Sequence, residues 1–169
     1  MNTAEKSDRF LSVIEANKGI ICKIANSYCK DPEDRKDLFQ EIVSQLWKSF
    51  DNYSEQYKYS TWIYRIALNV AISFYRKENR RKVLSSPISE GAFNFFIEEN
   101  SETESNLRML QQFIQELKDL DKALMLLYLE EKSHREIAEI IGISETNVAT
   151  KIGRIKLLLK QKFTTIENN

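Results

Sequence analysis

The side chains of this chain whose types and spacing could do chemistry are mostly cations and small polar groups on predicted helices. Residues 133–160, SHREIAEIIGISETNVATKIGRIKLLLK, predict two short helices joined by a tight turn, with a cationic second helix. Ser133 and Glu136 have the spacing of a capping box. Gly142 suits the left-handed residue that ends a helix, and Ser144 can cap a second one. This pattern is typical of a helix-turn-helix, whose second helix enters a DNA major groove; an ordinary helical hairpin is the alternative.

The elements that must position this segment are also predicted to be helical. Two prolines and four glycines among 169 residues favour helix, and apolar residues recur at helical spacing through most of the chain. Asp31 can cap a helix that starts at Pro32, Ser60 can cap a third helix, and Asp121 can cap a later one. The predicted helices before the helix-turn-helix run over about 7–29, 32–50, 60–82, 107–117 and 124–129.

A segment without helical spacing, residues 83–105, separates two groups of predicted helices. It carries five acidic and no basic side chains, whereas residues 1–82 have a net charge of +4 and residues 106–169 of +1. Its four apolar residues, Phe93, Phe95, Phe96 and Ile97, are expected to dock on another surface. The sequence therefore predicts an all-α fold of two small helical domains, 7–82 and 106–162, joined by an acidic linker at 83–105, with the helix-turn-helix in the second domain.

Other functions have little support in the sequence. Cys22 and Cys29 lie seven residues apart on one predicted helix, about 10.5 Å along it, which is too far for a disulfide. With His134 as the single histidine, no metal site or nucleophile–base pair is readable, and we expect no cofactor, no metal and no small-molecule substrate. The first residues lack the apolar core of a signal peptide, and no apolar run approaches the length of a membrane span. These features predict a cytoplasmic protein.

The third predicted helix ends in a cluster of five cations. Positive charge interacts favourably with a helix C-terminus, so the cluster could be a solvated helix end. It could equally be a patch that binds phosphate, and the cluster alone does not decide between the two. Its members are Arg76, Lys77, Arg80, Arg81 and Lys82.

Three ordered motifs give the chain its resemblance to a known family. DLFQEIVSQLW at 37–47 is similar to a polymerase-binding helix. FDNY at 50–53, followed by STWIYRIALNVAISFYRKENRR at 60–81, is similar to a promoter-melting region. Residues 117–159 are similar to a reader of the upstream promoter element. Together they resemble an extracytoplasmic-function (ECF) sigma factor of bacterial RNA polymerase over nearly the whole chain.

The resemblance implies roles for individual residues of the first domain. Asp37, Gln40 and Glu41 match the polar face that binds the clamp coiled coil of the polymerase. Tyr53 and Asn69 match positions that contact an unstacked base of the minus-ten element, since an aromatic ring can stack on a base and an amide can read its edge. The matching cations that meet backbone phosphates near the melted DNA are Arg76, Lys77, Arg80 and Arg81. Without the resemblance, the acidic face could be simply solvated, and Tyr53 could simply cover the core.

The resemblance also implies that the last helix contacts the minus-thirty-five element, through Ala149, Thr150, Lys151, Gly153 and Arg154. Two positions depart from the family pattern, because Ala149 and Gly153 have no side chain that donates a hydrogen bond. Glycine inside a helix also costs about 1 kcal/mol relative to alanine. Readout is then expected to depend on Thr150, Lys151, Arg154, the DNA backbone and DNA shape.

The function that follows is a transcription initiation factor rather than an enzyme. Its implied partners are core RNA polymerase, promoter DNA and an anti-sigma factor, possibly membrane-bound, with a monomer in the free state. One alternative is a helix-turn-helix regulator whose N-terminal domain senses a ligand or dimerises. That alternative explains residues 107–160 but not the polar helix or the tyrosine-rich loop. A helical enzyme is the other alternative, and no motif supports it.

Overall fold

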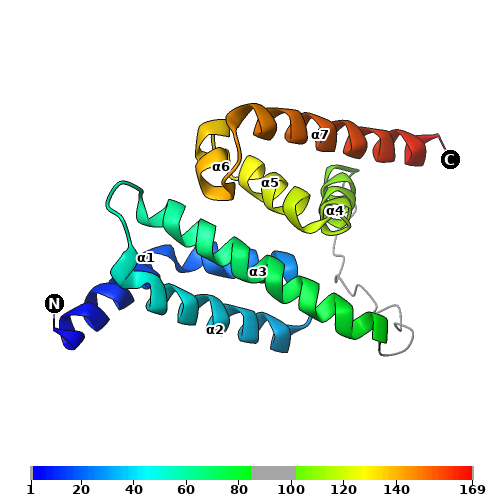
Figure 1. The fold of residues 1–169 in the computed structure, drawn as a ribbon. Helices are drawn as coiled ribbons and strands as arrows, with labels where there is room; N and C mark the ends of the chain where they lie inside the picture. The colour runs from blue at the N-terminus through cyan, green and yellow to red at the C-terminus, as the bar shows by residue number, and fades with distance from the viewer. Residues whose placement is uncertain (1, 85–101, 169) are drawn as a thin grey trace.

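The computed structural model describes residues 2–84 and 102–168, apart from the side chains at 79, 81–84 and 102, and no strand occurs in these ranges. This confirms the all-α fold class. Figure 1 shows the first three helices grouped together and the last four gathered on the far side of α3. The elements are α1 (Thr3–Tyr28), α2 (Pro32–Ser49), the short 3-10 helix η1 (Phe50–Asn52), α3 (Tyr59–Leu84), α4 (Glu102–Gln115), α5 (Asp119–Leu129), α6 (His134–Ile141) and α7 (Glu145–Glu167).

The core of the first group forms where α1, α2 and α3 pack on one another. Its fully buried aliphatic side chains each contribute about 1.5–3 kcal/mol by leaving water. On α2 they recur every four residues, which is one row along the helix surface. The large aliphatic residues of this group with 0% exposure are Ile21, Leu38, Ile42, Leu46 and Ile63, and the smaller Ala67 and Ala71 are buried to the same extent.

Of the three helix caps predicted before the helix-turn-helix, one is confirmed and two are wrong. Asp31 accepts a hydrogen bond from the backbone N–H of Glu33 at 3.1 Å, as predicted for the start of α2. The predicted cap at Ser60 is wrong, because α3 begins one residue earlier and the carbonyl of Lys58 accepts the N–H of Trp62 at 3.2 Å. The predicted cap at Asp121 is also wrong: it lies inside the first turn of α5, where its charge favours the helix dipole without capping it.

The first helix is longer than its apolar stripe predicted. It begins at Thr3 rather than near Ser7, because Asn2 and Glu5 form a capping box. The side-chain oxygen of Asn2 accepts the N–H of Ala4 at 3.4 Å, and the carboxylate of Glu5 accepts the N–H of Asn2 at 3.3 Å. These polar residues lie outside the apolar stripe, so a helix start inferred from that stripe comes too late in the sequence.

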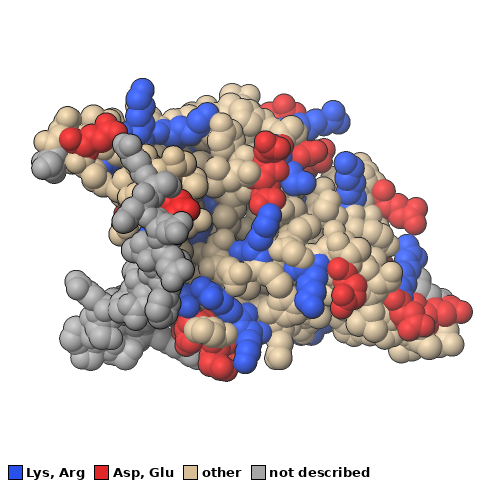
Figure 2. All heavy atoms as spheres, turned by 180° about the vertical axis from the view of Figure 1, so that it is seen from behind, with Lys and Arg blue, Asp and Glu red and all other residues tan. Residues whose placement is uncertain are grey.

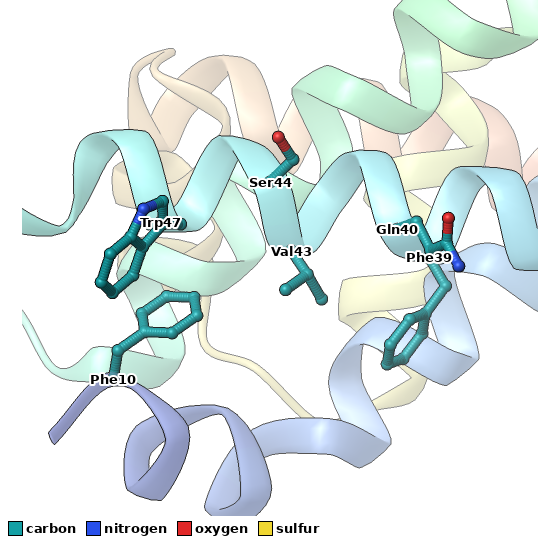
Figure 3. Close-up of a pocket in the computed structure, with 6 residues that line it drawn as sticks. All are labelled: Phe10, Phe39, Gln40, Val43, Ser44 and Trp47. Carbon is teal, nitrogen blue, oxygen red and sulfur yellow. The ribbon is translucent and has the colours of Figure 1, made fainter. Parts of the chain in front are cut away.

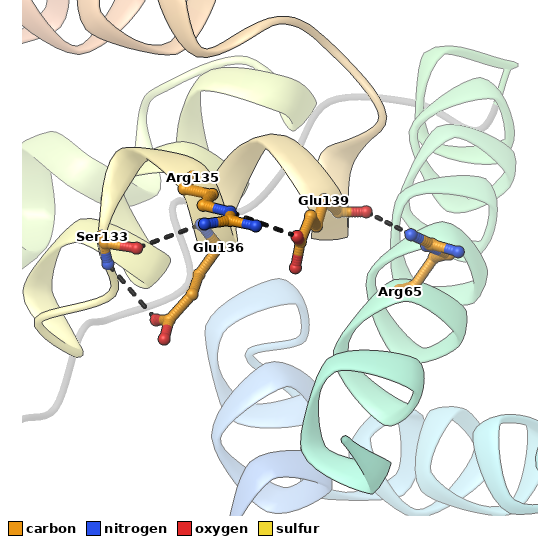
Figure 4. A network of polar contacts seen from close by, with 5 residues as sticks. All are labelled: Arg65, Ser133, Arg135, Glu136 and Glu139. Carbon is orange, nitrogen blue, oxygen red and sulfur yellow. Dashed lines mark hydrogen bonds and ion pairs between the residues drawn. The ribbon is translucent and has the colours of Figure 1, made fainter. Parts of the chain in front are cut away.

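The helix-turn-helix predicted at 133–160 is confirmed by α6, α7 and the turn between them. The N–H of Ser133 donates to the Glu136 carboxylate at 3.3 Å, and the N–H of Glu136 donates to the Ser133 hydroxyl at 3.1 Å (Figure 4). Gly142 ends α6 with a φ of 85°, a left-handed conformation that costs other residues steric strain. Ser144 caps α7 by accepting the N–H of Asn147 at 3.1 Å. Most of the predicted apolar stripe is buried, through Ile137, Ile140, Val148, Ile152, Ile155 and Leu159, whereas Ala138 and Ile141 are only partly buried.

The two helical groups meet along α3, which packs against α5 and α6. Helix α7 lies on the far side of α5 and α6 from α3 (Figure 1). Helix α3 extends through Leu84 and α4 begins at Glu102, so helix continues a short way into each end of the predicted linker. The apolar linker residues Phe93, Phe95, Phe96 and Ile97 lie outside the described residues.

Candidate nucleic-acid interface

The acidic and polar face of α2 is exposed to solvent. Asp37, Gln40 and Glu41 are spaced by three and four residues, so one helix face carries all three side chains. One turn further along, the side-chain amide of Gln45 donates to the Glu41 carboxylate at 3.1 Å. This bond holds the Glu41 carboxylate on the outward face of the helix, where an approaching partner can meet it.

An apolar hollow of about 380 Å³ lies beside this face, between α1 and α2 (Figure 3). Phe10 of α1 meets Trp47 of α2 edge-on, with ring centroids 5.1 Å apart. Gln40 is part of the lining, so the hollow and the polar face are continuous. The full lining is Phe10, Phe39, Gln40, Val43, Ser44 and Trp47.

The apolar wall of this hollow belongs to a second apolar row on α2, beside the row that faces the core. Two parallel rows exist on α2, each with a four-residue spacing. The first row is fully buried and consists of Leu38, Ile42 and Leu46. The second row, Phe39, Val43 and Trp47, is only partly buried, because it lies about 100° further round the helix and leaves the centre of the core. In the sequence, the apolar residues of this helix span more than one helix face, and that width is the signal that could have revealed the second row.

Tyr53 belongs to a small aromatic cluster at the start of α3. Its ring stacks on Tyr59, with centroids 4.3 Å apart, and meets Trp62 edge-on at 5.4 Å. Its hydroxyl donates to the carbonyl of Tyr57, and Arg9 of α1 donates to the Tyr59 hydroxyl at 2.9 Å. Burial, followed by the nearby Tyr59 and Glu55, raises the pKa of Tyr53, so the ring stays a neutral phenol. Sequence reasoning gave Tyr59 no role beyond a place in a tyrosine-rich loop.

Asn69 is exposed on the same side of α3 as the aromatic cluster. Trp62, Asn69 and Arg76 are separated by seven residues each, so they fall within about 40° of one another around the helix and about 10.5 Å apart along it. Because Tyr53 contacts Trp62, the loop tyrosine and Asn69 lie along one edge of the domain. The structure therefore places Tyr53, Asn69 and Arg76 along a single stripe, which we name the α3 stripe.

The cationic end of α3 projects into solvent at Arg76, Lys77 and Arg80. Figure 2 shows Lys and Arg side chains interspersed with Asp and Glu side chains over this face of the molecule. Arg76 is already engaged, because its Nε donates to the carboxylate of Asp119 in α5. The side chain of Arg81 lies outside the described residues.

The predicted minus-thirty-five residues lie on the outer surface of α7. Ala149, Thr150, Gly153 and Arg154 are exposed, and Lys151 is partly buried. The Thr150 hydroxyl donates to the carbonyl of Thr146 at 3.0 Å, which leaves its oxygen lone pairs outward. A Cβ atom added at Gly153 would have no heavy atom within 4 Å, apart from the backbone of its own helix and the adjoining residues.

The cationic run on α7 is divided between two faces, which its linear order did not show. Lys156 donates to the Tyr128 hydroxyl at 2.8 Å, and its ammonium lies 4.6 Å from the centre of that ring. Lys162 forms an ion pair at 3.0 Å with Glu116, the residue that follows α4. Lys156 and Lys162 therefore contact side chains of their own domain. Lys151 and Arg154 instead belong to the face of α7 that carries the predicted minus-thirty-five residues.

A buried lysine lies where the two domains meet. Lys122 of α5 is 2% exposed, and its ammonium lies 5.1 Å from the ring centre of Tyr28 and 4.8 Å from that of Tyr75. Burial lowers the pKa of Lys122, with Lys30 adding to the effect and Asp119 opposing it. Burial also raises the pKa of Tyr28, whose hydroxyl donates to the carbonyl of Asp119 at 2.9 Å. Burial, with Glu130 nearby, raises the pKa of Tyr64 on α3.

Comparison with known families gives two matches that follow the two domains. A model of sigma-70 region 2 matches residues 13–81, and a model of sigma-70 region 4 matches residues 107–159. RNA polymerase sigma factor SigV of Bacillus subtilis is 26% identical over 155 residues, covering 91% of this chain and 90% of the relative. The ECF RNA polymerase sigma-E factor of Haemophilus influenzae is 29% identical over 140 residues, covering 76% and 74%.

Two solved structures share the fold. The chain aligns with the structure of CnrH in complex with the cytosolic domain of CnrY at a TM-score of 0.66 and 18% identity, covering 94% of this chain and 90% of that one. It aligns equally well, at 0.66 and 19% identity, with the sigma factor RpoE from Bartonella quintana in complex with the anti-sigma factor NepR, covering 94% and 96%.

The architecture of a helical N-terminal domain and a helix-turn-helix C-terminal domain defines a class of two-domain DNA-binding protein. Since the two matched regions follow each other in order and span most of the chain, it belongs to the sigma-70 family of RNA polymerase sigma factors, within the ECF type. It is a transcription initiation factor of the class that directs RNA polymerase to promoters. This family membership argues against the alternative of a helix-turn-helix regulator with an N-terminal sensing domain.

Two other kinds of feature are not found among the described residues. Within residues 2–84 and 102–168, no helix combines the length and the apolar character needed to cross a bilayer. Across the same described ranges, no group of three or more His, Cys, Asp or Glu side chains is arranged to hold a metal ion.

Proposed function

We propose that this sigma factor uses three separate helices for three tasks. Helix α2 binds core RNA polymerase, α3 with its preceding loop captures the minus-ten element, and α7 binds the minus-thirty-five element. The observation that carries the proposal is the exposure of polar side chains on these three helices, in a chain whose two domains match two sigma-70 regions. The direct test is run-off transcription: core polymerase with the chain should initiate at sites that core polymerase alone ignores.

Polymerase binding is assigned to Asp37, Gln40 and Glu41 together with the adjacent hollow. Short acids and an amide on a rigid helix can pair with basic residues of a partner helix, and an apolar hollow beside them can take up an apolar side chain of the same partner. Interface energy concentrates in such a buried apolar centre within a polar rim. Gln40 lies in both parts of this surface, which makes it the residue that joins them.

Replacing Gln40 and Glu41 by alanine should weaken binding to core polymerase by at least tenfold. The free energy of unfolding should change by only about 0.5 kcal/mol or less, because both side chains are exposed. Fluorescence titration of labelled protein with core enzyme measures the first quantity, and urea unfolding the second. Lys48→Ala, also exposed on α2, is the matched control and should bind like the parent. Equal affinities for the double variant and the control would contradict the assignment.

The minus-ten element is assigned to the α3 stripe. An aromatic ring offers a stacking platform for an unpaired base, and Asn69 can hydrogen-bond to a base edge. The cations at the end of α3, Arg76, Lys77, Arg80 and Arg81, extend this surface with charge that suits backbone phosphates.

The minus-thirty-five element is assigned to Ala149, Thr150, Lys151, Gly153 and Arg154 on α7. Arg154→Ala should weaken binding to duplex DNA carrying that element. If Arg154 contacts a guanine through two hydrogen bonds, the loss should be about 1–3 kcal/mol and confined to one base pair. If it contacts phosphate, the loss should be similar for every sequence, and the salt slope should fall by about one. Anisotropy measurements over a salt series separate the two outcomes.

Lys160→Ala provides the control for this helix, since Lys160 is exposed on α7 nearly two turns further on. Its duplex affinity should remain closer to that of the parent than the affinity of Arg154→Ala does. Unchanged affinity of Arg154→Ala for every duplex and every salt concentration would reject this face of α7 as the DNA surface.

The proposal also covers the setting in which the chain acts. Its partners are core polymerase and promoter DNA in the cytoplasm, it is a monomer when free, and it carries out no catalytic step and needs no cofactor or metal. An anti-sigma factor anchored in the membrane is a further proposed partner. The two solved structures of similar fold are supportive, because CnrH is bound there by the cytosolic domain of CnrY and the sigma factor RpoE by the anti-sigma factor NepR.

A further inference from the structure

Arg9 of α1 carries a positive charge at the edge of the stacked tyrosines. Its Nη2 donates to the Tyr59 hydroxyl at 2.9 Å, and the Tyr59 ring stacks on Tyr53 with centroids 4.3 Å apart. Burial raises the pKa of Tyr53 and Arg9 opposes that shift, so the charge of the guanidinium acts on Tyr53 as well as binding Tyr59. Nothing in the sequence pointed to this residue, which lies 50 positions before Tyr59.

The position of Arg9 is fixed by its neighbour Phe10, which is 5% exposed. The Phe10 ring meets Phe50 edge-on, with centroids 5.3 Å apart. Phe50 in turn packs against Trp62 at 6.1 Å, and Trp62 contacts Tyr53. The start of α1 and the tyrosine-rich loop therefore share one aromatic cluster. A helix anchored in this way holds a side chain more precisely than a loop does.

The guanidinium of Arg9 has donors left for a further ligand. A guanidinium has five N–H groups, and the Tyr59 hydroxyl accepts one of them. Within residues 2–84 and 102–168, no carboxylate, that of nearby Glu55 included, forms an ion pair with Arg9. Arg9 is also exposed, so an anion that approaches the stack from solvent meets a charge already held in place. The planar fork of an arginine suits a phosphate group.

The cations already assigned to minus-ten DNA lie far from the stack. Arg76, the first of them, is 17 residues beyond Tyr59, which is about 25 Å along α3. Arg65 is closer, but it already donates to a carbonyl of α6 and lies over a tyrosine ring of the loop, 4.9 Å from its centre. A base that stacks on Tyr53 brings its own sugar and phosphate to the same place, because they are covalently attached. That phosphate needs a cation beside the stack.

We propose that Arg9 binds the phosphate of the nucleotide whose base stacks on Tyr53, and that the Tyr59 hydroxyl holds the guanidinium in place for this contact. The ligand is the phosphodiester backbone of single-stranded DNA, so the contact adds affinity without reading a base. The inference rests on the proposed capture of an unstacked base by Tyr53. It makes the start of α1 part of the minus-ten surface, next to the loop and α3.

The test measures how tightly the holoenzyme, assembled from the full chain and core polymerase, binds melted DNA. The probe is a fluorescent promoter fragment found in the run-off test, with its minus-ten region kept single-stranded by mismatches. Anisotropy over a salt series gives the affinity of the parent, Arg9→Ala, Arg9→Lys and Tyr59→Phe. Lys18→Ala is the matched control, because Lys18 is exposed on the opposite side of α1, nine residues further on.

Arg9→Ala should weaken binding about tenfold, the usual size for a hydrogen bond to a charged group. The slope of log affinity against log salt should become shallower by about 0.7, since one phosphate contact with a single strand is lost. Arg9→Lys should keep the parental slope, and Lys18→Ala should match the parent in affinity and slope. Tyr59→Phe should keep the slope and lose only part of the affinity, because the arginine is still present but is held less firmly.

Two outcomes would overturn the phosphate contact. One is a parental salt slope for Arg9→Ala, because a loss of affinity without a change in slope would mean that Arg9 only positions Tyr59. The other is an equal change of slope in Lys18→Ala, which would show a general effect of net charge. The proposed function fails in a different way: no run-off initiation by the parent, or parental binding of the melted probe by Tyr53→Ala/Asn69→Ala, would overturn that function instead.

Discussion

The double variant Tyr53→Ala/Asn69→Ala is expected to lose promoter opening on linear DNA while keeping its affinity for core polymerase. Permanganate reactivity of thymines in the polymerase–promoter complex should fall to the level without the sigma factor. Binding of duplex minus-thirty-five DNA should be unaffected, because α7 lies in the other domain. A template with a pre-melted bubble should restore part of the transcription.

The expected size of this effect follows from the energetics of base capture. Stacking one base on an aromatic side chain is worth about 1–3 kcal/mol, comparable to the few kcal/mol that unstacking it from the duplex costs. On the proposed assignment, the protein traps a base that has already left the stack, and removing both the ring and the amide leaves the open state without compensation. The cluster of Tyr53, Tyr59 and Trp62 holds the loop in place for this task.

Tyr53→Phe separates stacking from loop structure. It keeps the ring on Tyr59 but loses the hydrogen bond from the Tyr53 hydroxyl to the Tyr57 carbonyl. We expect Tyr53→Phe to retain most of the strand opening. Complete opening and parental transcription by Tyr53→Ala/Asn69→Ala would show that both residues are structural and that the base-capture assignment is wrong.

The second large effect is expected from Ile137→Ala, which removes a fully buried side chain at the centre of the helix-turn-helix. Losing an isoleucine from a packed core typically destabilises a protein by about 2–5 kcal/mol, since a cavity adds to the lost burial. Binding to minus-thirty-five duplex should be lost with the folded domain. Urea unfolding followed by circular dichroism measures the first change, and anisotropy the second.

Ile166→Ala is the control for this substitution, because Ile166 is 45% exposed near the end of α7. Its free energy of unfolding should change by about 0.5 kcal/mol or less. A loss smaller than about 1 kcal/mol for Ile137→Ala would mean that the α6–α7 packing can close over the gap, in contrast to well-packed cores.

The helix-turn-helix could be predicted almost residue by residue because its signals are local. A capping box, a left-handed glycine and a second cap each depend on neighbours within four residues, and all three occur where predicted. The starts of α3 and α5 were misplaced for the opposite reason. Ser60 and Asp121 are good caps by type, but the chain enters each helix earlier, and residue type alone does not fix which backbone N–H groups are free.

Contacts between residues far apart in the chain could not be predicted from the sequence alone. The division of the α7 cations depends on Tyr128 and Glu116, residues that lie 28 and 46 positions away from their partners. The same is true of Arg76, whose partner Asp119 is 43 positions away in the second domain. Among the predicted site residues, exposure was the property most easily anticipated, because polar positions opposite an apolar stripe face the solvent.

The empty space over α7 bears on how such a protein can acquire a new set of target genes. Ala149 and Gly153 are one turn apart, both outward, and a side chain placed at Gly153 begins in open space. Longer side chains can therefore be added there without disturbing the packing of α6 against α7, and replacing Gly153 by a good helix former should stabilise the helix by about 1 kcal/mol. On the proposed assignment of this face to DNA, Ala149 and Gly153 are therefore two positions at which a longer side chain can change promoter preference without loss of stability.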